Sequence, residues 1–288
     1  MAKNKANAPE EVGTTGHEWD GIQELNQPLP KWWLYILYAT IVWAIGYWLV
    51  YPAWPTVSSY SKGWMGYSQR DQVAKDVAAS HAEKAVFRDK IAAADMDSIK
   101  ADPELFNFAL AGGEAAFGDN CASCHGRGAQ GAVGYPNLRD DAWLWGGSLD
   151  AIHQTIKYGI RAEDPKTRAG MMPAFGQLGM LKRDQISDTA EYVMSLSGNA
   201  EDDEAAARGQ EIFATNCAAC HGPDGKGNQA LGAPNLTDEL WLYGGAKETI
   251  VETIYSSRAG MMPAWEERLD PATIKELAIY VHSLGGGQ

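Results

Sequence analysis

The feature that most constrains the fold of this 288-residue chain is an internal repeat. The heptapeptide Arg-Ala-Gly-Met-Met-Pro-Ala occupies residues 168–174 and recurs unchanged at 258–264. Upstream of each copy, the segment Cys-Ala-Ser-Cys-His-Gly at 121–126 matches Cys-Ala-Ala-Cys-His-Gly at 217–222. Matches spaced along both halves of a chain indicate two copies of one structural unit.

The repeats predict two sequential domains, at residues 108–198 and 203–285. A small acidic stretch at 197–207 separates them. Each copy has roughly 85 residues, few for a self-sufficient hydrophobic core, so we expect a bound cofactor to complete it. Strand-like alternation is nearly absent and helical patterns close each copy, at 183–196 and 271–284. The predicted fold class is all-α.

Each repeat carries Cys-x-x-Cys-His, the attachment signature of a c-type haem. The two thiols add to the porphyrin vinyl groups, and the adjacent histidine becomes the proximal iron ligand. We therefore predict two covalently bound haem c groups, with these residues in the attachment and ligand roles: Cys121, Cys124 and His125, and Cys217, Cys220 and His221. The alternative is a Cys₄ zinc site. A histidine follows each cysteine pair and the pairs lie in separate repeats, which favours haem.

A haem iron that shuttles electrons needs a sixth ligand, and a methionine thioether raises its reduction potential. Each heptapeptide supplies a Met-Pro dipeptide, so Met172 and Met262 are the predicted axial ligands. Proline restricts the local backbone and helps to hold the preceding side chain. The neighbouring Met171 and Met261 also recur and remain the alternative.

Three further pairs of recurring residues are predicted to surround the haems: Pro136 and Pro234, Arg168 and Arg258, and Trp143 and Trp241. A carbonyl near the prolines could accept the proximal imidazole N–H, although both could be ordinary loop prolines. The arginines could pair with haem propionates or simply lie on the surface. The tryptophans could pack on the porphyrin edge or in the protein core.

The segment 32–54 contains no charged residue, and tryptophan or tyrosine lies at both of its ends. We predict a transmembrane helix over 31–54, after a cytoplasmic segment 1–30 and before a largely helical tether, 55–107. A cleaved signal peptide is the alternative. The apolar run is too long for one, and no small-residue cleavage site follows it.

The chain is acidic, with 24 lysine and arginine residues against 37 aspartate and glutamate residues. From residue 55 onward it holds 21 basic and 32 acidic residues, a net charge of −11. This balance excludes a typical nucleic-acid-binding protein and favours partners that are basic at their docking face.

The order of these motifs resembles class I cytochrome c over both repeats. Residues 14–38, the single anchor and the tandem cytochrome c domains together resemble the di-haem subunit (subunit III) of cbb3-type cytochrome c oxidase. This resemblance implies electron transfer from a donor cytochrome c towards the catalytic haem b/copper subunit or a mono-haem cytochrome c subunit. It also implies that this chain has no catalytic site of its own. The expected location is the bacterial inner membrane, single-pass, with the haem domains periplasmic.

Two other functions are compatible with the haem motifs alone. One is a membrane-anchored di-haem cytochrome that serves another periplasmic redox enzyme. The other is a di-haem peroxidase, which needs an open iron and is therefore disfavoured by the paired Met-Pro motifs. Within the oxidase family, methionine ligation crossed between the repeats is conceivable, whereas the cytochrome c fold favours ligation within each repeat.

Overall fold

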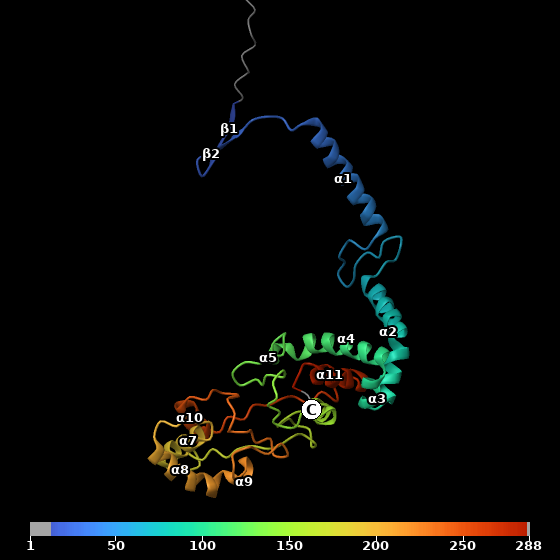
Figure 1. Cartoon of the computed structure of the whole chain (residues 1–288). Helices are drawn as coiled ribbons and strands as arrows, with labels where there is room; N and C mark the ends of the chain where they lie inside the picture. Colours follow the sequence, from blue (N-terminus) through green and yellow to red (C-terminus); the bar gives the residue numbers. More distant parts are fainter. Residues whose placement is uncertain (1–12, 287–288) are drawn as a thin grey trace, which may run out of the picture. The chain divides into compact units, whose positions relative to one another are not determined.

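The computed structural model describes residues 13–286 and confirms an all-α fold with little strand. The chain divides into two units, one ending at His81 and one beginning at Ala82. The helices in chain order (Figure 1) are α1 (Lys31–Val50), α2 (Gln69–Ala93), α3 (Met96–Ala101), α4 (Pro103–Asn120), α5 (Ala122–His125), α6 (Leu149–Tyr158), α7 (Arg183–Ser195), α8 (Asp203–Asn216), α9 (Ala218–His221), α10 (Lys247–Ser256) and α11 (Pro271–Ser283).

A small antiparallel hairpin precedes the first helix, with strands β1 (Thr14–Trp19) and β2 (Ile22–Leu25). Asp20 and Gly21 form its turn, and both have left-handed backbone angles, with φ of 51° and 84°. Asp-Gly is the preferred dipeptide of two-residue hairpin turns. This dipeptide is the sequence signal for the hairpin, which lies outside the two repeats. Residues 1–12 of the predicted cytoplasmic segment lie outside the described residues.

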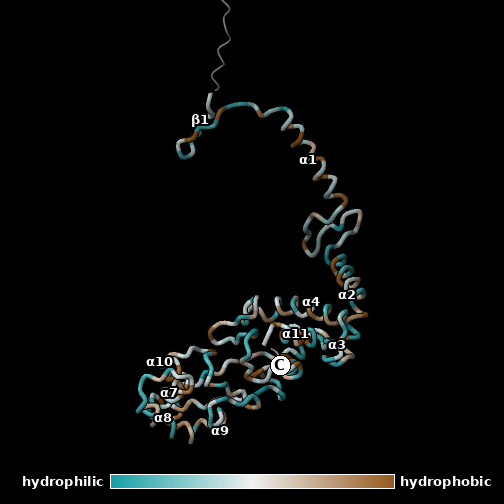
Figure 2. Tube along the Cα trace, viewed as in Figure 1, coloured by the Kyte–Doolittle hydropathy of each residue, from teal (hydrophilic) through white to brown (hydrophobic). Residues whose placement is uncertain are grey.

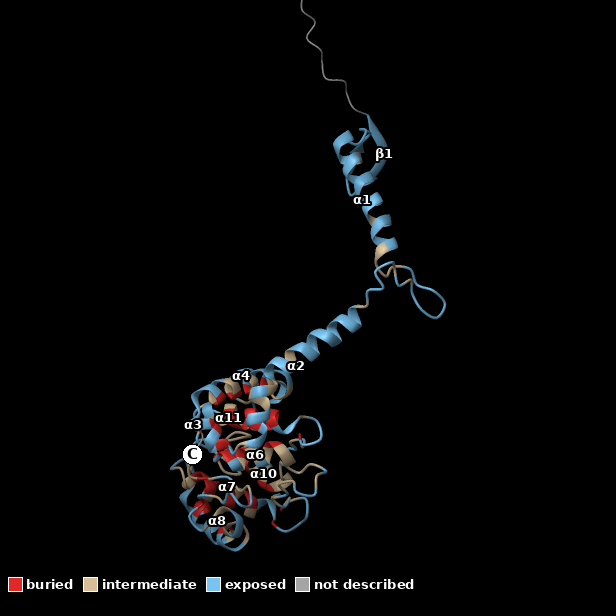
Figure 3. Ribbon diagram, turned by 90° about the vertical axis from the view of Figure 1, so that its right-hand side faces the viewer, coloured by how far each residue is buried: buried red, intermediate tan, exposed pale blue. Residues whose placement is uncertain are grey.

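Among the described residues, α1 alone is long and apolar enough to cross a membrane. Figure 2 shows the hydropathy along it, and none of its apolar stretch is buried by protein (Figure 3). Its 20 residues span about 30 Å, the thickness of a bilayer's hydrocarbon core. The helix ends four residues before the predicted limit of 54. Tyr51 is extended, and the chain folds back so that the Trp64 and Met65 N–H groups bond the carbonyls of Leu49 and Val50.

The tether is less independent than the sequence suggested, because its later part belongs to the second unit. Phe87 stacks on Phe108 with ring centroids 4.9 Å apart. Ile91 and Ile99 are fully buried in the same core. The C-terminal end of α2 therefore packs against the core of the second unit through its apolar side chains.

The second unit has two hydrophobic cores, and each combines helices of both repeats (Figures 1 and 3). In the first core, α4 and α6 of the first repeat pack against α11 of the second. In the second core, α8 and α10 of the second repeat pack against α7 of the first. Each core therefore takes its closing helix from the other repeat, so the repeats exchange their closing helices.

Glycines at the two helix crossings show how closely the exchanged helices pack. A Cβ atom on Gly113 of α4 would lie 2.3 Å from the backbone oxygen of Glu276 in α11. A Cβ atom on Gly209 of α8 would lie 2.0 Å from the backbone oxygen of Asp188 in α7. Only glycine permits such a backbone approach. The first helix of each repeat therefore packs closely against the closing helix of the other repeat.

The two crossings neutralise their acidic side chains differently. Arg208 of α8 binds the Asp188 carboxylate at 2.8 Å. Position 112 on α4 is a glycine. Within residues 13–286, the Glu276 carboxylate, 2% exposed, has Arg88 of α2 at 3.9 Å as its one ion-pair partner, and its Oε1 accepts no hydrogen bond. Burial accordingly raises the pKa of Glu276 above its ordinary value.

We expect Glu276→Gln to stabilise the second unit by about 1 kcal/mol near pH 7. A carboxyl with a raised pKa in the folded state stabilises fully below its unfolded pKa, and this contribution is lost as the pH rises through the folded value. Thermal unfolding between pH 4 and pH 8 will measure the effect. Asp188→Asn, at the matching position of the ion-paired crossing, is the control and should bring no gain. An unchanged pH profile in Glu276→Gln would contradict this prediction.

Candidate haem sites

Each Cys-x-x-Cys-His motif begins at the end of a long helix and continues as one short helical turn. Cys121 caps α4 through its N–H bond to the Phe117 carbonyl, and the His125 N–H returns to the Cys121 carbonyl at 3.0 Å. Cys217 and His221 repeat this arrangement after α8. Side chains three positions apart share one face of a helical turn. All four cysteines are free thiols, so both pairs can form thioether bonds on one side of a porphyrin.

Both histidines are oriented by a backbone carbonyl. His125 Nδ1 lies 3.0 Å from the Pro136 oxygen, and His221 Nδ1 lies 3.2 Å from the Pro234 oxygen. Donation from Nδ1 fixes the tautomer and leaves Nε2 as the free ligand atom. Burial lowers the pKa of both histidines, with the carbonyl bonds opposing it, so the imidazoles are neutral at pH 7. A neutral imidazole is the form that binds iron.

The methionines lie with the Cys-His motif of the other repeat. Met262 packs against the first core, where Cys121 and Trp143 also lie. Met172 packs against the second core, together with Cys217 and Trp241.

The alternative ligands, Met171 and Met261, behave differently. Met171 is 70% exposed and Met261 is 69% exposed.

Hydrogen bonds also link each Met-Pro segment to the other repeat. Ile160, just after α6, exchanges two bonds with Met262, N–H to O at 2.9 Å and 3.0 Å. The Trp265 N–H then bonds the Lys157 carbonyl of α6 at 3.1 Å. On the other side, the Ser257 hydroxyl donates to the Met172 carbonyl. Each Met-Pro segment therefore docks on the helix end of the opposite repeat.

The arginines that begin the heptapeptides stay with their own repeat. Arg168 donates to Thr155 Oγ1 at 2.8 Å and to the Ala151 carbonyl of α6, and its guanidinium lies over Trp145. Arg258 bonds Thr249 and Thr253 of α10 in the same way and lies over Tyr243. Each heptapeptide thus starts in one core and ends in the other. Pairing of these arginines with propionates stays a prediction.

These residues fit haem c and not a zinc site. Residues 13–286 contain no group of three or more His, Cys, Asp or Glu side chains that could share a metal ion. Cys121 also packs against the first core and Cys217 against the second, so the two cysteine pairs do not share one Cys₄ site. Each core instead offers two thiols, one oriented imidazole and one methionine, the complete set for covalent attachment and two axial ligands.

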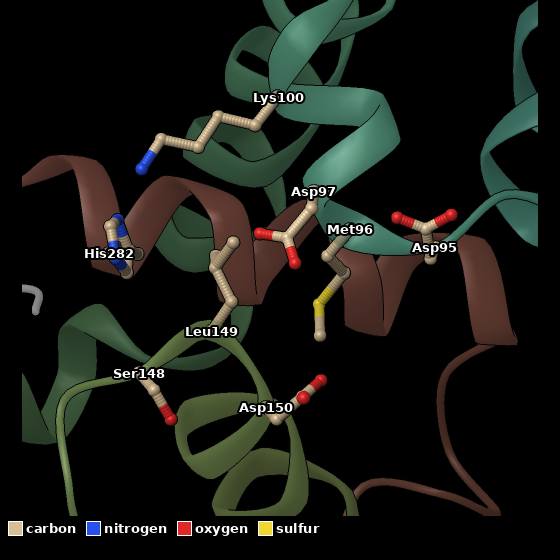
Figure 4. A pocket seen from close by; sticks show the side chains of 8 residues that line it. All are labelled: Asp95, Met96, Asp97, Lys100, Ser148, Leu149, Asp150 and His282. Carbon is tan, nitrogen blue, oxygen red and sulfur yellow. The ribbon is translucent and has the colours of Figure 1, made fainter.

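A pocket of about 230 Å³ lies between α3, the start of α6 and α11, away from the residues described above (Figure 4). Asp97, Asp150 and Lys100 give it mixed charge, and His282 lies at one end. None of the predicted site residues lines it.

Three known families together match most of the chain. The family described as the N-terminal domain of cytochrome oxidase-cbb3, FixP, covers residues 11–58. The cytochrome c family covers residues 110–197. The family described as cytochrome c oxidase, cbb3-type, subunit III, covers residues 204–281.

Three similar relatives are all described as cbb3-type cytochrome c oxidase subunits. A cbb3-type cytochrome c oxidase subunit FixP of Bradyrhizobium sp. (strain ORS 278) is 58% identical over 281 residues, 96% of each chain. A subunit CcoP of Azospirillum brasilense is 51% identical over the full length of both chains. A subunit CcoP of Cereibacter sphaeroides is 50% identical over 97% of each. The chain therefore belongs to the FixP/CcoP family of cbb3-type cytochrome c oxidase subunits, in which cytochrome c domains carry out electron transfer.

Proposed function

We propose that this chain carries electrons from a donor cytochrome c to the oxygen-reducing part of a cbb3-type oxidase through two His/Met haems c. The observation that carries the proposal is that one Cys-x-x-Cys-His motif and one partly buried methionine pack against each core. Haem c supplies a reversible one-electron carrier at each site. The protein attaches it, orients its histidine and closes the sixth position against other ligands.

The proposed ligand pairs are crossed between the repeats. His125 and Met262 belong to the haem on Cys121 and Cys124. His221 and Met172 belong to the haem on Cys217 and Cys220. The support is the packing of each methionine in the core of the opposite Cys-His motif and the backbone bonds that dock it there. In this proposal both haem sites lie within the second unit of the chain.

The proposal extends to partners and location. We infer that the chain spans the inner membrane once through α1, with its N-terminus cytoplasmic and both haem sites periplasmic. The catalytic haem b/copper subunit and a mono-haem cytochrome c subunit are its proposed neighbours. The acidic surface beyond the membrane segment, with net charge −11, should steer a donor with a basic docking face.

The steering proposal predicts a steep salt dependence. The second-order rate constant for electron transfer from a basic cytochrome c should fall by about tenfold or more between low and physiological ionic strength. Added salt shortens the Debye length and so screens the attraction between the two proteins. Stopped-flow reduction of the purified complex measures this rate. A rate independent of salt would contradict the steering role of this surface.

The function is tested by purification of the assembly in mild detergent through a tag on this chain. A reduced-minus-oxidised spectrum together with copper analysis should show haem c accompanied by haem b and copper in fixed proportion. Haem c alone, under several detergents, would contradict membership of an oxidase complex and favour service to another redox enzyme. Carbon monoxide binding to both haems c in the native chain would contradict His/Met ligation.

A further inference from the structure

Arg161 stands out among the residues that the haem sites do not use. It lies in the segment between α6 and the first heptapeptide, where the first repeat is longer than the second, so it has no counterpart there. Its backbone is left-handed, with φ of 52°, and its N–H bonds the Arg168 carbonyl at 2.8 Å. A non-glycine residue with this φ is held by its surroundings at a small conformational cost.

The Arg161 guanidinium contacts both heptapeptides at the same position. Its Nε donates to the Gly260 carbonyl at 2.7 Å, and its Nη1 donates to the Gly170 carbonyl at 2.6 Å. These glycines each stand two residues before a proposed ligand, Met262 and Met172 respectively. Charge-assisted bonds of this length are stronger than neutral ones. The Arg161 side chain therefore bonds the backbone just before both proposed methionine ligands.

The charge of Arg161 is directed at these carbonyls and not at a carboxylate. Within residues 13–286 it forms no ion pair shorter than 4.0 Å. Burial lowers the pKa of its guanidinium, with Tyr243 opposing the shift, but an arginine remains charged at pH 7. Arg168 and Arg258, by contrast, each bond the helix of a single repeat.

We propose that Arg161 is a positioning residue shared by both haem sites, which fixes the two crossed methionine segments together. The inference rests on the proposed function, because it concerns the ligands Met172 and Met262. It adds a coupling between the sites: loss of one side chain should loosen both sixth ligands at once. A fixed positive charge within two residues of each ligand also favours the reduced state of both haems.

The test uses Arg161→Gln and Arg161→Lys in the full chain, purified with its complex. The readouts are the number of haems c per chain that bind carbon monoxide when reduced, and the two haem c midpoint potentials. For Arg161→Gln we expect carbon monoxide binding to rise from none towards two haems c per chain, with both potentials lowered. Arg161→Lys keeps the charge without the planar fork and should give an intermediate result.

Arg127→Gln is the matched control, because it removes an exposed arginine beside the first Cys-His motif. It should leave carbon monoxide binding unchanged. A change confined to one haem, or no change in either Arg161 variant, would overturn the shared role. If Arg161→Gln does not accumulate, Arg161→Lys provides the test. Carbon monoxide binding that rises at both haems c supports the shared role, and a rise at one haem c overturns it. Carbon monoxide binding by the unmodified chain would instead overturn the proposed His/Met ligation, so the two failures are distinct.

Discussion

Met262→Leu is expected to leave one haem c per chain without its sixth ligand. The open iron should bind carbon monoxide when reduced, and the midpoint potential of that haem should fall, because a thioether ligand raises it. Met262 packs against the first core, and leucine preserves this apolar contact while removing the sulfur. Carbon monoxide titration and redox potentiometry of the purified protein measure the change as one haem per chain.

The neighbouring methionine provides the matched control. Met261→Leu should change neither haem, since its side chain is 69% exposed and contributes to neither core. Met172→Leu and Met171→Leu should reproduce the contrast at the second site, and the double variant at 172 and 262 should open two haems. An effect of Met261→Leu as large as that of Met262→Leu would reassign the ligand to the first methionine of the doublet.

Lys247→Met is expected to destabilise the second unit, because it removes the cation that pairs with a buried carboxylate. Glu191 of α7 is completely buried and contacts the Lys247 amine at the start of α10. Its other oxygen accepts the Glu201 N–H at 3.1 Å. Loss of the lysine leaves a buried carboxylate without its cation, which costs about 3 kcal/mol, at the lower end for buried pairs because Lys247 is partly exposed. This corresponds to a fall of about 6–12 °C in Tm.

Thermal unfolding of Lys247→Met at pH 7 measures this loss, and the exposed pair of Lys226 and Asp224 supplies the control. Those side chains lie 3.6 Å apart and are mostly exposed, so Lys226→Met should change stability by less than about 0.5 kcal/mol. The hydrogen bond from Lys247 is the main cause that lowers the pKa of Glu191.

A lowered pKa gives the loss a definite pH dependence. The stabilisation by this pair is present above the ordinary pKa of glutamate and is lost as the pH falls through the lowered value. The difference between Lys247→Met and the unmodified chain should therefore shrink in acid. Equal stability of both at pH 7 would contradict the role of this pair in holding α7 of the first repeat to α10 of the second.

The chemistry of the sites can be predicted from the sequence because the motifs that carry it are local. Cys121, Cys124 and His125 lie within one helical turn, so their spacing alone describes their geometry. The fold class, the apolar helix and the carbonyl that faces each histidine also depend on short segments.

The exchange of helices could not be predicted from the repeats. The repeat pattern does not distinguish the two arrangements, because Gly113 and Gly209 meet the backbone at matching positions of the two closing helices, Glu276 and Asp188. The choice depends on asymmetric contacts between distant residues. These include Arg161 with Gly260, and Glu191 with Lys247, and neither has a counterpart at the matching positions of the other repeat.

The crossed assignment of the two methionines is tested most directly in a chain with a single haem c. Cys121→Ala with Cys124→Ala removes the first attachment site and leaves only the haem on Cys217 and Cys220. In that background, Met172→Leu should convert the remaining haem to a carbon monoxide-binding form, and Met262→Leu should leave it unchanged. The opposite result, with the haem opened by Met262→Leu and unaffected by Met172→Leu, would contradict the crossed arrangement.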